Sequence, residues 1–195
     1  MVRGLVAYLG QVEPGWSVDL LSIYHGIWPS LEGVRAVLNY GEFPQESIDW
    51  DLLAGYDQFL LFGSDVLDGH HSRAESMDRL RMLDRASEHG LRPTVLGFSF
   101  DDRPDERVMA RLKRLSTRVT LCVRDPASLR RLERRGVESL TLVADVAFLM
   151  PPAAQSAATR ETEQWVAAQQ ASGRRVAIVC LSVQVLATAE EADPA

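Results

Sequence analysis

Apolar residues follow two alternating patterns along the chain. Six short runs are almost continuously apolar, as buried strands are, and they span residues 18–23, 34–38, 58–62, 94–98, 119–123 and 140–143. Between the later runs, apolar residues instead recur every three or four positions, which is the spacing of one helix face. This alternation of strand and helix with short connections predicts an α/β fold in which helices cover a parallel sheet.

Capping residues show where the helices begin and end. Ser72 and Glu75 stand three residues apart as a capping box, and Gly90 suits the end of the helix that follows. Asp125 can cap another helix, and Pro126 fits its first turn. Together with the apolar spacing, these signals predict helices over residues 73–89, 104–115 and 126–135, and the spacing alone predicts one over 1–13.

The last third of the chain has a different character. The prolines at 151–152 and the small polar residues up to 159 predict a linker, which a helix over 161–172 follows. Residues 176–183 form a strong strand candidate that has no clear place in the first sheet. We therefore expect three parts: a Rossmann-like domain over 1–150, a linker and crossover helix over 151–174, and the start of a second domain over 175–195.

Small and polar residues follow four of the predicted strands directly. They are Gly63-Ser64-Asp65, Ser99-Phe100-Asp101, Arg124-Asp125 and Asp145, of which only Phe100 is apolar. Ligands of open parallel sheets bind outside the carboxyl ends of the strands, so these positions are the candidate site. Loop residues are also polar simply because loops contact water, and this plainer interpretation remains open for each position taken alone.

The chemistry of these positions allows two interpretations. Arg124 lies beside a helix N-terminus, which suits an anion or a sugar hydroxyl, but it could equally pair with Asp125 to fix the loop. Asp65 and Asp68 could act as an acid/base pair, although turn formation before a glycine explains them as well. The histidines at 70–71 are more typical of a solvated loop than of a metal site, and we expect no metal.

Charge is unevenly distributed along the chain. Residues 73–135 hold 16 of the 21 basic and 10 of the 27 acidic residues, a net charge of +6 against −12 for the rest. Solvated helix faces explain this best, and a positive rim around an anionic substrate is the alternative. Acidic residues interrupt the basic segments and no aromatic stripe accompanies them, so we expect no nucleic-acid partner.

Other features limit the classes of protein further. No apolar run is long enough for a membrane span and no secretory leader pattern is present, so a cytoplasmic location is the default expectation. Cys122 and Cys180 lie in apolar runs and read as free buried thiols, and the four tryptophans read as packing anchors. Dinucleotide, P-loop and nucleophile-elbow motifs are absent from the sequence.

Four segments together resemble the polysaccharide pyruvyl transferase family. They are Phe62-Gly63-Ser64-Asp65-Val66-Leu67-Asp68-Gly69, Leu96-Gly97-Phe98-Ser99-Phe100, Val123-Arg124-Asp125-Pro126-Ala127-Ser128 and Ala144-Asp145-Val146-Ala147-Phe148-Leu149. Each motif is short, but their order and spacing are fairly specific. The resemblance covers about residues 15–183.

The resemblance implies both a fold and an activity. Members of this family are similar to B-type glycosyltransferases, in which two Rossmann-like domains face a cleft, so this chain would form the N-terminal domain with helices on both faces of its sheet. They transfer a pyruvyl group from phosphoenolpyruvate to sugar hydroxyls of cell-surface glycans, and no cofactor is implied. The matching positions give Asp65 and Asp145 as catalytic candidates. The substrate-binding candidates are Gly63, Ser64, Ser99, Phe100, Arg124, Asp125 and Ser128.

Two departures from the family pattern keep other functions open. The family opens with a strand and an Asn- and Gly-containing loop that this sequence lacks, and most of the family's second domain has no counterpart here. We therefore expect a chain truncated at both ends, which could be a non-catalytic fragment or a binding module. A B-type glycosyltransferase that uses a nucleotide sugar is a further alternative.

Overall fold

The computed structural model describes residues 2–22, 31–39, 48–150 and 157–177. The chain divides into two compact units, residues 1–151 and 152–195. In the first unit, the strands are β1 (Val18–Ser22), β2 (Val34–Asn39), β3 (Gln58–Ser64), β4 (Arg92–Phe98), β5 (Thr120–Val123) and β6 (Leu140–Leu142). Its helices are α1 (Val2–Val12), α2 (Trp50–Leu53), α3 (Arg73–Glu88), α4 (Glu106–Leu115), α5 (Pro126–Arg134) and the 3-10 helix η2 (Val146–Leu149).

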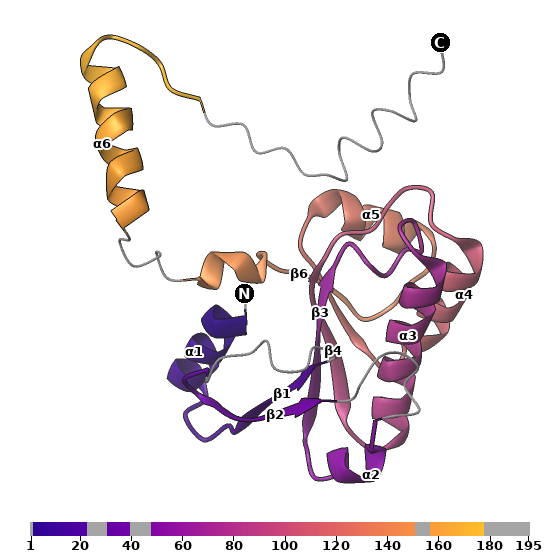
Figure 1. The fold of residues 1–195 in the computed structure, drawn as a ribbon. Coiled ribbons are helices and arrows are strands. Elements are labelled where there is room, and N and C mark those ends of the chain that lie inside the picture. Colours follow the sequence, from indigo (N-terminus) through magenta and orange to yellow (C-terminus); the bar gives the residue numbers. More distant parts are fainter. Residues whose placement is uncertain (1, 23–30, 40–47, 151–156, 178–195) are drawn as a thin grey trace. The chain divides into compact units, whose positions relative to one another are not determined.

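Four parallel strands form the main sheet in the order β3-β4-β5-β6. Successive strands are neighbours, and α3, α4 and α5 connect them in turn. Right-handed crossovers that always step in one direction place their helices on the same face of a sheet. Figure 1 accordingly shows α3 and α4 on one side of β3 and β4, with α1 on the other side. The predicted parallel α/β architecture is confirmed.

The main core lies between this sheet and its three helices. Leu80 and Leu83 from α3, Leu112 from α4 and Leu132 from α5 are fully buried, and they belong to the same cluster as Leu121 of β5. These leucines follow the three-to-four spacing that predicted the helices, so the helical pattern in the sequence and the buried face coincide. The core therefore fixes the three helices on the sheet and, with them, the loops at the strand ends.

The capping signals operate largely as expected. The Ser72 hydroxyl accepts a hydrogen bond from the Glu75 amide at the start of α3, and Asp125 caps α5 with Pro126 in its first turn. The start of α4 differs slightly, because Asp105 is its cap and the helix begins at residue 106 rather than at 104. Burial raises the pKa of the Cys122 thiol in β5, whereas Cys180 lies outside the described residues.

Strands β1 and β2 form a separate parallel pair. No strand pairing joins β1 to β3 in the described part of the chain, and β3 has a strand partner there only on its β4 side. A largely apolar cavity of about 310 Å³ lies between the two sheets, lined by residues of α1, β1, β2 and β3. A smaller core in which Trp50, Met82 and Leu91 are buried packs against Leu21 and Leu38 of the small sheet.

Some elements differ from the sequence-based expectations. The helices α2 and η2 were not predicted, because four residues are too few to show a period. The helix α6 (Ala157–Ala171) in the second unit begins inside the stretch expected to be a linker. Most of the strand expected over 176–183 lies outside the described residues, and Val176 and Ala177 are not in a strand. The described helices include none that is long and apolar enough to span a membrane.

Candidate functional site

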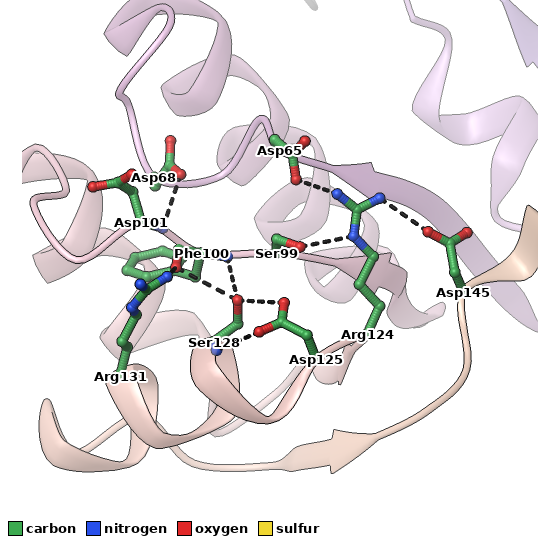
Figure 2. A network of polar contacts seen from close by, with 10 residues as sticks. All are labelled: Asp65, Asp68, Ser99, Phe100, Asp101, Arg124, Asp125, Ser128, Arg131 and Asp145. Atoms are coloured by element: carbon green, nitrogen blue, oxygen red, sulfur yellow. Dashed lines mark hydrogen bonds and ion pairs between the residues drawn. The ribbon is translucent and has the colours of Figure 1, made fainter. Parts of the chain in front are cut away.

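The polar residues that follow the strands of the main sheet meet at its carboxyl edge. Arg124 follows β5 directly, and its side chain reaches the loops after β3, β4 and β6 (Figure 2). Its Nε donates to Ser99 Oγ at 2.7 Å, its Nη1 to Asp145 Oδ2 at 3.0 Å, and its Nη2 to Asp65 Oδ1. One guanidinium therefore ties together four loops that lie far apart in the sequence.

The two carboxylates around Arg124 differ in access. The side chain of Asp65 is 50% exposed, and its Oδ2 accepts no hydrogen bond from the described residues. Asp145 is half as exposed, and both of its oxygens accept hydrogen bonds. Its Oδ2 accepts from Arg124, and its Oδ1 accepts from the Ala147 amide at 2.8 Å, so that Asp145 also caps the start of η2. Of the two predicted catalytic carboxylates, Asp65 is thus the one that a ligand can reach more freely.

Arg124 itself keeps part of its hydrogen-bonding capacity. A guanidinium has five N–H donors in a planar fork, and three of them are used in the contacts with Ser99, Asp145 and Asp65. The remaining two belong to the same Nη atoms that hold the carboxylates. The side chain is 26% exposed, so a ligand oxygen can approach these donors.

A second network fixes the loop after β4 against the start of α5. Asp125 accepts hydrogen bonds from the Ser128 amide at 2.8 Å and from the Ser128 hydroxyl at 2.7 Å. The Ser128 hydroxyl in turn accepts from the Phe100 amide at 2.8 Å, and Arg131 Nη1 donates to the Phe100 carbonyl at 2.7 Å. Burial would raise the pKa of Asp125, but the hydrogen bonds from Ser128, from Ser99 and from the Ala127 amide together outweigh it and the pKa is lowered.

Burial separates the predicted substrate-binding residues into two groups. The side chains of Phe100 and Ser128 are almost fully buried, and Phe100 belongs to the main core. Gly63 lies in β3, where a Cβ atom would come within 2.3 Å of Phe98 Cβ, so its missing side chain makes room for β4. These three residues have structural roles in this geometry. A direct ligand contact by any of them stays a prediction.

The remaining predicted residues lie closer to the surface. Ser99, Arg124 and Asp145 converge as described, and Asp125 is partly exposed beside them. Ser64 is the last residue of β3 and pairs with Phe98, but its side chain is outside what the structure describes. The carboxyl-edge network, defined here as Asp65, Ser99, Arg124 and Asp145, is the candidate site.

Two further residues support this site: Asp68, for which the sequence left an acid/base role and a turn role open, and Arg131, which was not predicted as part of it. Asp68 is buried and accepts hydrogen bonds from the His70 amide at 2.9 Å and the Asp101 amide at 3.1 Å, so it joins the loops after β3 and β4. Arg131 lies one turn after Ser128 on α5. The position of Asp68 directly before Gly69 indicated a turn. No local pattern indicated that the Asp68 carboxylate also contacts the loop after β4.

The described residues provide no evident metal site. They contain no group of three or more histidine, cysteine, aspartate or glutamate side chains that could surround an ion. Asp101 is oriented instead by the Arg103 amide, which donates to it at 2.8 Å and is the main cause of its lowered pKa. In the carboxyl-edge network, the groups that can contact a ligand are the hydrogen-bond donors and acceptors of the side chains themselves.

Comparison with known proteins identifies a family for the chain. The sequence profile of the polysaccharide pyruvyl transferase family matches residues 11–181. The match includes β1 to β6 and all four loops of the carboxyl-edge network. Searches of curated proteins and of solved structures find no match. Because the profile spans most of the sequence, the chain belongs to the polysaccharide pyruvyl transferase family.

Proposed function

We propose that the chain takes part in transferring a pyruvyl group from phosphoenolpyruvate to a sugar hydroxyl of a glycan, and that the carboxyl-edge network binds the acceptor. The observation that supports this role is the balance of charge in the network. A single guanidinium, that of Arg124, contacts two carboxylates, those of Asp65 and Asp145. The network is therefore acidic, which favours a ligand that donates hydrogen bonds.

The two substrates differ sharply in this respect. Phosphoenolpyruvate carries a carboxylate and a phosphate, about three negative charges near neutral pH, and would be repelled by Asp65 and Asp145. A sugar hydroxyl is neutral and both donates and accepts. It can donate to the free Oδ2 of Asp65 and accept from one of the two unused N–H groups of Arg124.

The same contacts suit the reaction. When a pyruvate ketal forms, two sugar oxygens bond to the central carbon of phosphoenolpyruvate, its methylene carbon gains a proton, and inorganic phosphate leaves. Each attacking hydroxyl must lose its proton. Asp65 Oδ2 is positioned to accept one such proton, while Arg124 orients the sugar and Asp145 holds Arg124 in place.

A non-catalytic role in glycan binding is the second candidate. It is favoured by the way Arg124 is engaged by its own carboxylates and by Ser99, which makes the network rigid without any ligand. Such a preorganised network can bind a sugar whether or not transfer follows. A B-type glycosyltransferase that uses a nucleotide sugar is the third candidate, and no contact among the described residues favours it.

One assay separates these candidates. The full chain is incubated with phosphoenolpyruvate and a panel of neutral oligosaccharides, and both phosphate release and the mass of the glycan are measured. We expect acceptor-dependent phosphate release with ketal formation, reduced about 100-fold or more in Asp65→Asn. Asp51→Asn, an exposed aspartate on α2, is the matched control and should keep full activity.

The other outcomes would contradict the proposal in different ways. Glycan binding that depends on Arg124 without any phosphate release would establish the binding module instead. A nucleotide sugar that raises the melting temperature when phosphoenolpyruvate and glycans do not would favour the glycosyltransferase. Equal turnover by Asp65→Asn and Asp51→Asn would remove Asp65 from the reaction.

A further inference from the structure

A second arginine–aspartate cluster lies at the opposite, amino edge of the strands. The side chain of Asp19 in β1 is buried, and its carboxylate accepts hydrogen bonds from Arg35 Nε at 3.1 Å, from Arg35 Nη2, from the Tyr56 hydroxyl and from the Ala36 amide at 2.9 Å. The hydrogen bonds from Arg35 are the main reason why the pKa of Asp19 is lowered, although burial acts in the opposite direction. Asp19 thereby fixes Arg35 and Tyr56 in one geometry.

Arg35 is held in this way but remains accessible. Its side chain is 64% exposed even though two of its nitrogens bind Asp19. The third nitrogen, Nη1, donates no hydrogen bond to the described residues. An exposed arginine is usually free to move, and ordering it for a ligand costs entropy. Here the buried carboxylate has already ordered it, so its free N–H groups are available at a fixed position.

Arg35 lines a cavity of about 530 Å³, which we call the amino-edge pocket. The other residues of its wall come from the loops before β1 and β3 and from the starts of β3 and β4; they are Gly15, Trp16, Ser17, Gly55, Tyr56, Asp57, Gln58 and Arg92. The volume lies within the range of small-molecule sites. The pocket is separated from the carboxyl-edge network by the length of β3, about 20 Å for seven residues.

Trp16 is the aromatic residue of the pocket with a large exposed surface. The sequence suggested a packing anchor, but the side chain is 45% exposed, and it lies next to Gly15, where a Cβ atom would meet nothing within 4 Å. The structure therefore corrects that expectation for Trp16. An exposed indole beside open space offers an apolar face on which a ring can stack and an N–H that can donate.

The polar groups of the pocket fit a neutral ligand. Arg35 and Arg92 are balanced by Asp19 and Asp57, so an anion gains no net attraction. With the side-chain amide of Gln58 oriented to match its neighbours, its oxygen accepts from Arg92 Nε at 3.1 Å and from Arg92 Nη2 at 2.9 Å, which holds this second guanidinium against the start of β3. A pyranose ring has an apolar face and a rim of hydroxyls. The aromatic face of the pocket can contact the apolar face of the sugar, and the planar guanidinium, amide and carboxylate groups around it can bind the hydroxyls.

We propose that the amino-edge pocket is a second glycan-binding site, in which a sugar unit stacks on Trp16 and its hydroxyls bind Arg35 and Arg92. The choice of a glycan as the ligand rests on the proposed function. A glycan of several units can then contact the carboxyl-edge network and the amino-edge pocket together, and its affinity rises because the second contact is intramolecular. A monosaccharide can occupy only one of the two sites at a time.

The experiment follows Trp16 directly. The full chain, labelled with ¹⁵N at its indole nitrogens, is titrated with neutral hexasaccharides of glucose, galactose or mannose and with the matching monosaccharides. We expect one hexasaccharide to shift the Trp16 indole signal, which is assigned by its loss in Trp16→Ala. Trp16→Ala should weaken binding of that hexasaccharide by about tenfold, and Gly55→Leu should do the same by filling the pocket.

Two variants make the test selective. Gly55 lies in the wall of the pocket and a Cβ atom there meets nothing within 4 Å, so the side chain in Gly55→Leu starts in open space rather than in the packed fold. Trp165→Ala on α6 removes another exposed tryptophan, 56% exposed, and should leave the affinity unchanged. A Trp16 signal that no hexasaccharide shifts, or equal affinities of Trp16→Ala and Trp165→Ala, would overturn the proposal.

The result is independent of the assay for pyruvyl transfer. Asp65→Asn should reduce phosphate release and leave the hexasaccharide-induced shift of Trp16 in place. If phosphate release is absent but Trp16 still responds, the proposed transfer fails and the glycan site stands. If transfer occurs and Trp16 does not respond, only the second site is lost.

Discussion

The two edges of the parallel strands carry arginine–aspartate clusters with opposite plans. At the carboxyl edge an arginine, Arg124, is central and holds the carboxylates of Asp145, which is about as buried as the arginine, and of Asp65, which is more exposed. At the amino edge a buried carboxylate, Asp19, is central and holds the more exposed guanidinium of Arg35. The central groups, Arg124 and Asp19, are paired with opposite charges inside their clusters. The more exposed partners, Asp65 and Arg35, face solvent.

This difference assigns different chemistry to the two edges. A presented carboxylate can bind a hydroxyl and also take its proton, whereas a presented guanidinium binds but stays protonated at any ordinary pH. Asp65 therefore gives the carboxyl edge a group that can react. Arg35 gives the amino edge a group that can only hold a ligand. The carboxyl edge thus has a group suited to reaction, and the amino edge has a group suited only to binding.

The largest expected effect concerns the glycines of the two edges. Gly63→Ala would place a Cβ atom 2.3 Å from Phe98 Cβ, so β3 and β4 must separate, and the free energy of unfolding should fall by about 3 kcal/mol. Gly55→Ala meets nothing within 4 Å and should change it by less than about 0.5 kcal/mol. Urea denaturation of the two variants measures the difference. Equal stabilities would show that the carboxyl edge is not tightly packed.

The next effect distinguishes the central from the peripheral carboxylate. Asp19→Ala removes four hydrogen bonds from a buried position and leaves the Ala36 amide without its partner, so we expect a loss of about 2 kcal/mol. Asp65→Ala removes one exposed contact and should cost less than about 1 kcal/mol. Thermal denaturation monitored by circular dichroism compares them. The reverse order would contradict the opposite plans of the clusters.

A smaller effect is expected at the start of α5. Asp125→Ala removes the helix cap and the partner of the Ser128 hydroxyl, and the free energy of unfolding should fall by about 1 kcal/mol. Because Ser128 also holds the Phe100 amide, we expect greater hydrogen exchange at Phe100 as well. Asp105→Ala at the start of α4 is the matched control: it loses a cap but should leave Phe100 protected.

The smallest expected effect of a single residue is on the pH dependence of the melting temperature. Arg35 lowers the pKa of Asp19 at the amino edge, and the hydrogen bonds from Ser128 lower that of Asp125 despite its burial. A carboxylate with a lower pKa in the folded state stabilises the fold above its unfolded value, and this contribution is lost as pH falls through the folded value. The melting temperature should therefore decline below about pH 4.

Amide variants assign this decline to one edge or the other. Asp19→Asn and Asp125→Asn should each make the melting temperature less dependent on pH between about 4 and 2, because the titrating group is gone. Asp51→Asn serves as the control and should keep the full decline. If neither substitution reduces the slope, the acid sensitivity has its origin in other carboxylates.

The sequence determined those features that depend on neighbours along the chain. The strands β1 to β6 and the helices α3, α4 and α5 follow from apolar spacing, and the caps at Ser72 and Asp125 follow from residues two or three positions away. The polar residues after the strands could also be found, because parallel strands bring their carboxyl ends to one edge. The family that the four motifs suggested was then confirmed by the profile match over residues 11–181.

Tertiary structure decided which of these residues touch one another. Arg124 contacts Asp65 across 59 positions of sequence, and Asp19 contacts Tyr56 across 37. Whether Phe100 turns into the core, or Trp16 stays exposed, depends on the register of the strands and on the loops that meet beside them. Short-range periodicity fixes an element and its apolar face. The partners of a polar side chain depend on long-range packing, which no local pattern encodes.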